Sequence, residues 1–300
     1  MNEVVKIGTR DSKLALWQAN HTKNQLGKLN IPVKIIKIKS QGDLNQTTPL
    51  YEFGVTGIFT KNLDRALLNN EIDVAVHSLK DVPIKPAIGI QIVSVFKRAN
   101  PLDVLVLRNE EINYSKNLTI ATSSIRRKCQ WINKYPNHNI EVLRGNVDTR
   151  LKKLRNSNWD GAIFAKAGID RLDLNIKNTE MLEWMIPSAA QGAIALATRE
   201  NNKSLIEKIK KINCNETMRC VNQERNFLEL MGGGCSMPIS AYAYFNNDQL
   251  IMKTNICSIN GVQSISDISS YEKNDSEAGL KSYHTILEKG GGKILKSNLT

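Results

Sequence analysis

The segment His77-Ser78-Leu79-Lys80-Asp81-Val82-Pro83 holds the residue types best suited to chemistry. It follows residues 72–76, a short β-branched run that predicts a buried strand. Ligands of open α/β sheets bind beyond the carboxyl ends of the strands. We therefore expect Asp81 to present a carboxylate at the mouth of a cleft, with Lys80 beside it. An ordinary polar turn is the alternative interpretation of this segment by itself.

Arginines gather where strands are predicted to end and helices to begin. Arg126 and Arg127 follow the predicted strand 118–121, while Arg144 and Arg150 follow the predicted strand 140–143. Helix N-termini attract anions, and arginine binds carboxylates through paired hydrogen bonds. The pattern predicts a ligand with several carboxylates or phosphates, although any one arginine could instead pair with an acidic residue. Three more arginines fit it, namely Arg10, Arg98 and Arg171.

A glycine-rich loop precedes Cys235 in Met231-Gly232-Gly233-Gly234-Cys235. Glycines allow close approach of the backbone, and a cationic surrounding lowers the pKa of a thiol. Cys235 is therefore a candidate nucleophile or covalent attachment point. A small residue in a tight turn is the alternative, which we favour for the remaining cysteines, Cys129, Cys214, Cys220 and Cys257.

The composition bounds the class of protein. The 300 residues, 41% of them hydrophobic, suffice for two or three domains. The net charge of +12 suits nucleic acid, a membrane surface or acidic ligands, but blocks of consecutive like charge are absent. Five scattered cysteines without metal-binding spacing indicate free thiols and no metal site. Without a signal peptide or a membrane-length apolar run, we expect a cytoplasmic protein that binds neither membrane nor nucleic acid.

Strands and helices alternate along most of the chain, which predicts the α/β class. The first lobe (1–98 and 193–214) has expected strands 4–8, 33–38, 72–76, 89–95 and 193–198, and helices 12–28 and 58–69. Ser12 is placed to act as the N-cap of the first of these helices. The second lobe (99–192) has expected strands 104–107, 118–121, 140–143 and 161–164, and helices 124–134, 147–156 and 165–172. Two crossings, 97–103 and 187–192, would join these lobes as in the clamshell of periplasmic-binding-protein domains. A small α+β domain (215–300) with strands 239–245, 250–257 and 262–269 carries Cys235.

The order of these motifs resembles the porphobilinogen deaminase (hydroxymethylbilane synthase) family. The matching segments cover nearly the whole chain: Gly8-Thr9-Arg10, Ser12, Leu14-Ala15-Leu16-Trp17-Gln18-Ala19, Gly42-Asp43, the segment 77–83, the segment 122–127, Leu143-Arg144-Gly145-Asn146-Val147, Thr149-Arg150-Leu151, Gln191-Gly192 and Gly233-Gly234-Cys235. The resemblance implies a monomeric transferase of haem and tetrapyrrole biosynthesis. It would join four porphobilinogen molecules head to tail, with loss of ammonia, on a covalent dipyrromethane cofactor. Hydrolysis would then release hydroxymethylbilane.

The resemblance also assigns roles to residues. The catalytic aspartate falls on Asp81, and the thioether to the cofactor falls on Cys235. The other cofactor-binding positions fall on Lys80, Ser124, Arg126, Arg127, Arg144, Gly145 and Arg150, with Asp81 among them. The substrate-binding positions fall on Arg10, Ser12, Gln18, Arg98, Arg171 and Gln191. Carboxylate arms on every pyrrole explain the need for arginines, and the cation left by departing ammonia explains the need for a carboxylate.

The chain departs from the family in one loop. Gln41, Glu52 and Thr56 stand where basic residues are usual, although Lys61 remains. Two other classes stay open at this point. A two-lobed receptor for a small anion would need the arginines but neither Cys235 nor Asp81. A nucleic-acid binder would suit the charge but lacks a recognisable motif.

Overall fold

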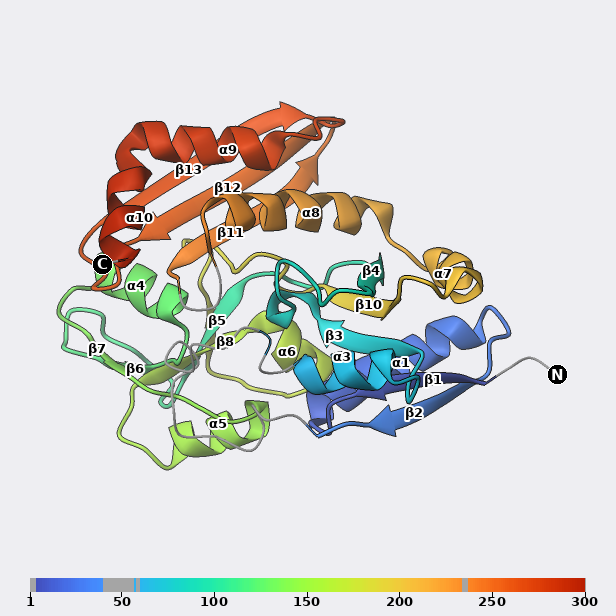
Figure 1. The fold of residues 1–300 in the computed structure, drawn as a ribbon. Helices are drawn as coiled ribbons and strands as arrows, with labels where there is room; N and C mark the ends of the chain where they lie inside the picture. The colour runs from blue at the N-terminus through green and yellow to red at the C-terminus, as the bar shows by residue number, and fades with distance from the viewer. Residues whose placement is uncertain (1–3, 40–56, 58–59, 234–236, 300) are drawn as a thin grey trace. The chain divides into compact units, whose positions relative to one another are not determined.

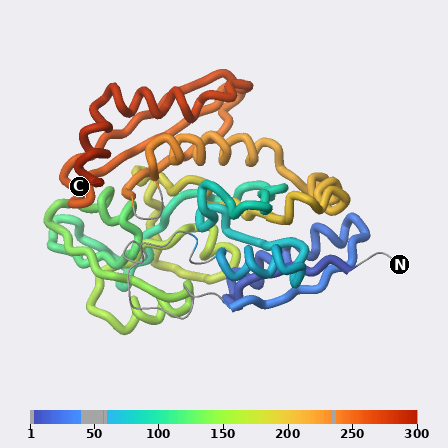
Figure 2. Tube along the Cα trace, in the orientation of Figure 1, coloured from blue at the N-terminus to red at the C-terminus, as the bar shows by residue number. Residues whose placement is uncertain are grey.

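The computed structural model describes residues 4–39, 57, 60–233 and 237–299. Its described residues form two compact units. The first comprises 4–39, 57, 60–99 and 192–218, and the second comprises 100–191, 219–233 and 237–299. Figure 2 shows the chain passing from the first unit to the second and returning before the C-terminal segment.

The first unit is built on a five-stranded sheet in the order β2-β1-β3-β10-β4 (Figure 1). Three strands are parallel, namely β1 (Val5–Thr9), β2 (Val33–Lys37) and β3 (Val74–Ser78). The returning strand β10 (Ile194–Arg199) runs antiparallel to both β3 and β4 (Ile90–Val95). The carboxyl ends of β1 and β3 therefore meet at one edge of this sheet.

Helices cover both faces of this sheet because its side chains alternate between them. Val74 and Val76 share a core with Leu26 of α1 (Lys13–Gly27) and with α7 (Lys203–Lys210). Ala75, between those valines, instead shares a core with Leu67 of α3 (Lys61–Leu68).

The second unit contains a sheet with the same plan, in the order β7-β6-β8-β5-β9. Its parallel strands are β6 (Thr119–Ala121), β7 (Asn139–Glu141) and β8 (Gly161–Ala165). The antiparallel strand is β5 (Asp103–Leu107), which pairs with β8 and with β9 (Thr179–Met181). One face packs against α5 (Val147–Arg155) and α6 (Lys166–Arg171), and the other against α4 (Ile125–Lys134).

The C-terminal part of the second unit is a three-stranded antiparallel meander, β11-β12-β13 (Figure 1). The strands are β11 (Ile239–Asn246), β12 (Gln249–Cys257) and β13 (Ser264–Glu272). One hydrophobic core joins Ala241 and Met252 of this sheet to Phe227, Ile286 and Ile294. These last three residues belong to α8 (Asn215–Leu230), α9 (Ala278–Ile286) and α10 (Gly292–Leu299).

The α/β class, the two lobe sheets and the small C-terminal sheet domain are confirmed, as is the return of strand 193–198 to the first sheet. Strand β9 and helices α7 and α10 were not predicted. The predicted strand 140–143 is displaced: β7 ends at Glu141, and Leu143 packs in the core beyond it. The division into three domains stays a prediction. Among the described residues, none of the helices has both the length and the apolarity to cross a membrane.

Candidate active site

A small pocket of about 70 Å³ lies in the first unit at the carboxyl ends of β1 and β3. Four residues predicted from the sequence line it, namely Arg10, Ser12, Gln18 and Asp81. Arg10 directly follows β1, while Asp81 ends the short 3₁₀ turn Leu79–Asp81 that continues β3. Parallel pairing brings these two segments to one place although they are about seventy residues apart.

The start of α1 is fixed against the end of β3 by side-chain hydrogen bonds. As predicted, Ser12 caps α1, with its Oγ accepting from the amide of Ala15 at 3.3 Å. The Oγ1 of Thr9 donates to the Ala15 carbonyl at 3.0 Å. The buried Gln18 reaches the neighbouring strand, where its Nε2 donates to Ser78 Oγ at 2.8 Å. The pocket is therefore held by residues that also build the fold.

His77 is a buried titratable group of this pocket, with 6% of its surface exposed. Burial lowers the pKa of its imidazole, and the charge of Arg10 lowers it further, to about 4. His77 is therefore neutral at neutral pH. The pocket then contains a cation at Arg10, an anion at Asp81 and a neutral imidazole.

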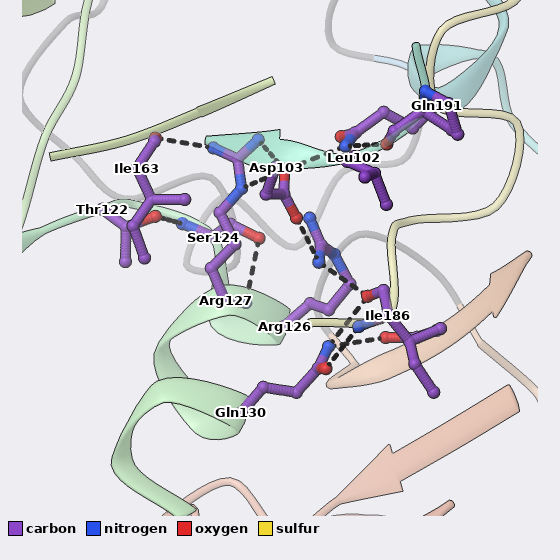
Figure 3. Close-up of polar contacts among 12 residues, drawn as sticks. Leu102, Asp103, Thr122, Ser124, Arg126, Arg127, Gln130, Ile163, Ile186 and Gln191 are labelled. Carbon is purple, nitrogen blue, oxygen red and sulfur yellow. Dashed lines mark hydrogen bonds and ion pairs between the residues drawn. The ribbon is translucent and has the colours of Figure 1, made fainter. Parts of the chain in front are cut away.

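A second polar cluster lies in the second unit around Asp103 (Figure 3). Asp103 Oδ1 accepts from Arg127 Nε at 3.0 Å and from Arg127 Nη2 at 2.7 Å. Its Oδ2 lies 2.7 Å from Arg126 Nη1 in an ion pair. Arg126 and Arg127 also donate to the carbonyls of Ile186 and Ile163, both at 2.9 Å. The structure thus brings together two arginines predicted from the sequence and gives them a carboxylate partner.

Electrostatics keeps Asp103 ionised. Burial by itself would raise the pKa of this carboxyl, because its side chain has no exposed surface. The guanidinium groups of Arg126 and Arg127 outweigh burial and hold the pKa of Asp103 well below its ordinary value. Gln191, predicted to bind substrate, also donates to this carboxylate, with its Nε2 at 2.9 Å from Oδ1 and at 2.7 Å from the carbonyl of Pro101.

Four more of the residues predicted to bind the cofactor lie at the ends of the strands and the starts of the helices of the same sheet. Ser124 caps α4, its Oγ accepting from the amide of Arg127. Arg144 is buried beyond β7, and the Nε of Arg150 in α5 donates to the carbonyl of Gly145 at 2.7 Å. Gly145 has a φ of 114°, in the region that favours glycine.

The remaining predicted residues belong to neither the first-unit pocket nor the Asp103 cluster. Arg98 lies near the end of the first unit's second segment, where its amide donates to Thr217 Oγ1. Arg171 ends α6, and burial lowers the pKa of its guanidinium to about 10. Lys80 lies in the 3₁₀ turn beside Asp81. The predictions for Cys235, and for Gln41, Glu52 and Thr56, lie outside the described residues.

Sequence reasoning missed Asp103 as part of a site. It looked for polar groups after strands, whereas Asp103 is the first residue of β5. Because β5 is antiparallel to β8, its first residue pairs with Ala165 at the carboxyl end of β8. The available signal was an aspartate directly before the apolar run 104–107.

The fold and these clusters define an α/β protein with charged side chains gathered at the carboxyl ends of its parallel strands. Residues 5–207 match the family model described as "Porphobilinogen deaminase, dipyromethane cofactor binding domain". Residues 218–287 match "Porphobilinogen deaminase, C-terminal domain". The chain belongs to the porphobilinogen deaminase family. This confirms the predicted transferase class, with its dipyrromethane cofactor and its role in tetrapyrrole biosynthesis, over the anion receptor.

Individual relatives agree with this assignment. The chain is 40% identical to the porphobilinogen deaminase of Francisella tularensis subsp. novicida, covering 86% of this chain and 87% of that protein. It is 39% identical, with the same coverage, to that of Francisella tularensis subsp. holarctica. Among solved structures, the Bordetella pertussis BvgS periplasmic VFT2 domain is similar at 14% identity and a TM-score of 0.43, covering 70% of this chain and 86% of that one. So weak a likeness indicates nothing about the ligand.

Proposed function

We propose that the pocket in the first unit is where porphobilinogen is added to the growing chain, with Asp81 as the catalytic residue. The observation that carries this proposal is the meeting of Asp81 with Arg10, Ser12 and Gln18 around one pocket. Arg10 and Asp81 follow two neighbouring strand ends, as expected for a ligand site of a parallel sheet, while Ser12 and Gln18 come from the cap and first half of α1. Arg10 would bind a substrate carboxylate, while the hydroxyl and amide groups would orient the pyrrole.

Asp81 would act through its negative charge. Departure of ammonia from porphobilinogen leaves a cationic carbon, and a carboxylate fixed in a sheltered pocket stabilises such a charge as it develops. Asp81 could also hold the proton of a pyrrole nitrogen. Neutral His77 adds no competing positive charge to this pocket.

The residues of the second unit fit a cofactor that carries carboxylates. Nε and Nη2 of the buried Arg126 have no hydrogen-bond acceptor, and the buried Oγ of Ser123 no partner, among the described residues. When bound, dipyrromethane supplies the pyrrole carbon to which the first substrate is joined. We propose that it is held by the second-unit residues Ser124, Arg126, Arg127, Arg144, Gly145 and Arg150. The cofactor-binding roles of Lys80 and Asp81 rest on the family resemblance alone.

Cys235 remains the proposed attachment point, on the strength of the family resemblance. Two other thiols are poor nucleophiles, which supports the choice. Burial raises the pKa of Cys129 to about 12 and also raises the pKa of Cys257. Intact mass tests the attachment. Cys235→Ser should lose the dipyrromethane adduct. The control Cys214→Ser, which changes a partly exposed thiol, should retain the adduct. An adduct on Cys235→Ser would reject the assignment.

The catalytic role of Asp81 is tested by Asp81→Asn, which removes the charge and keeps the size. We expect kcat to fall by about 10²–10³ or more with little change in substrate capture. The control Asp248→Asn removes a carboxylate whose side chain is 94% exposed in the other unit, and should leave kcat unchanged. Single-turnover elongation of adduct-bearing Asp81→Asn at nearly the normal rate would reduce Asp81 to a turn residue.

The remaining assignments follow from the same resemblance. We propose that Arg98, Arg171 and Gln191 contribute to binding of substrate or the growing chain, and that the chain works as three domains with the boundaries given above. We further propose a cytoplasmic monomer that binds neither nucleic acid nor membrane. The described cysteines are free, which suits a reducing compartment. Light scattering and a nucleic-acid binding assay at physiological salt would test the last points.

A further inference from the structure

The charges of the Asp103 cluster do not cancel. Two guanidinium groups face one carboxylate, so the cluster keeps one net positive charge. The side chains of Arg126 and Arg127 are each only 6% exposed, and that of Asp103 is not exposed at all. Buried charge of this kind is costly unless it is paired. The cluster therefore has room, electrostatically, for one more anion.

The hydrogen-bond donors lead to the same conclusion. A guanidinium carries five N–H groups. Arg127 uses all three of its nitrogens, on Asp103 and on the carbonyl of Ile163. Arg126 uses Nη1 alone, on Asp103 and on the carbonyl of Ile186. In the described part of the chain, Nε and Nη2 of Arg126 have no acceptor, so this arginine can take a second carboxylate without releasing Asp103.

Asp103 is held too firmly to be displaced by a ligand. It is the first residue of β5 and pairs there with Ala165. Gln191 Nε2 fixes the same carboxylate from a different segment, and also bonds to the carbonyl of Pro101. Figure 3 shows Asp103 between the two arginines and Gln191. An anion that arrives at this cluster therefore joins Asp103 rather than replacing it.

We propose that Asp103 is the resident counter-ion and positioning residue of the Arg126–Arg127 pair, and that a carboxylate of dipyrromethane joins the cluster as its second anion. This inference rests on the proposed cofactor site. Asp103 does not touch the cofactor. It fixes the planes of both guanidinium groups before the cofactor is present, and so lowers the cost of organising the site.

The test compares the thermal stability of two forms of the full chain. Apoprotein comes from cells that cannot make porphobilinogen and holoprotein from cells that can, with the adduct verified by intact mass. Asp103→Asn leaves two buried cations without a counter-ion, so we expect the apoprotein Tm to fall by roughly 5–15 °C. In the holoprotein the cofactor carboxylate supplies an anion, so the loss should be smaller and the holo–apo difference in Tm should widen.

Asp160→Asn is the matched control. Asp160 lies in the same unit and accepts from the amide of Thr119 at 2.7 Å. We expect equal losses of Tm in its apo and holo forms. If Asp103→Asn behaves in the same way, Asp103 is merely structural and the proposal is overturned. If the cofactor does not touch the arginines at all, Arg127→Leu will load normally and keep the wild-type holo–apo difference, which identifies failure of the proposed cofactor site instead.

A double variant keeps the inference testable if apo Asp103→Asn does not fold. Adding Arg127→Leu to Asp103→Asn restores the net charge of the cluster to +1. We expect the apo double variant to melt within a few degrees (~5 °C) of Arg127→Leu, because the lost charges were partners. An apo double variant that melts far below Arg127→Leu, or does not fold, would show that the lost charges were not partners, and would overturn the proposal.

Discussion

His77 should make the first unit sensitive to acid. Its pKa is 6.5 in an ordinary setting and about 4 in the folded protein, because it is buried and faces the charge of Arg10. Between these two values the unfolded chain binds a proton and the folded chain does not. The free energy of unfolding therefore rises with pH in this window, and is lost as pH falls from about 6.5 to about 4.

The size of the effect follows from the two pKa values. The two pKa values differ by about 2.5, and each pKa unit corresponds to about 1.36 kcal/mol. The difference therefore gives roughly 3 kcal/mol of stability that is present at pH 7 and lost at pH 4. Solvent screening does not reduce this value, because only 6% of the surface of His77 is exposed. Since domains are stable by about 5–15 kcal/mol, such a loss is large.

Native-state hydrogen exchange of the β3 amides measures this loss within the first unit. Wild-type protein and His77→Gln should differ in the pH dependence of the opening free energy by roughly 3 kcal/mol between pH 6.5 and 4. The control His284→Gln removes an exposed imidazole of the other unit and should leave exchange in β3 unchanged. Equal pH dependence in wild type and His77→Gln would show that His77 is not held neutral, and would refute the reasoning.

Two further predictions concern the segment before the chain returns to the first unit. Ala190 has a φ of 59°, a backbone conformation that is strained for alanine. Ala190→Gly should therefore raise the free energy of unfolding, measured by urea titration, by about 1 kcal/mol, whereas the control Ala189→Gly should lower it. Equal effects of the two substitutions would show that the backbone at Ala190 is not strained. The buried carboxylate of Glu224 accepts from the amides of Ala190 at 2.6 Å and Ala243 at 2.7 Å, so Glu224→Gln should cost about 1–3 kcal/mol, and an unchanged urea midpoint would contradict this.

The first-unit pocket could be predicted because its residues follow strands. Residues 72–76 are rich in β-branched apolar side chains, with Ile72, Val74 and Val76, and the polar run after them marks the end of the strand. Ser12 was recognisable as a helix cap, and the structure uses it as one. The rules of parallel sheets then bring the segments after β1 and β3 together without knowledge of any long-range contact.

The Asp103 cluster could not be predicted in the same way. It joins residues from β5, α4 and the segment before Gly192, and such pairings depend on which strand of the sheet runs antiparallel. Sequence reasoning recognised Arg126 and Arg127 as cations near an anion site. It could not decide whether their partner belongs to the protein or to a ligand, and the structure supplies a partner from the protein.

The two sheets share one strand plan but place their carboxylates differently. Asp81 lies in a turn beyond a parallel strand and lines the first-unit pocket, so its charge is available to a cation. Asp103 begins an antiparallel strand and is covered by two arginines, so its charge serves the protein itself. The corresponding sheet edges therefore present a pocket with an available carboxylate in one unit and a cluster with one net positive charge in the other. Under the roles proposed above, the cation formed from the substrate would meet the carboxylate of Asp81, and the carboxylates of the cofactor would meet the positive cluster of the other unit.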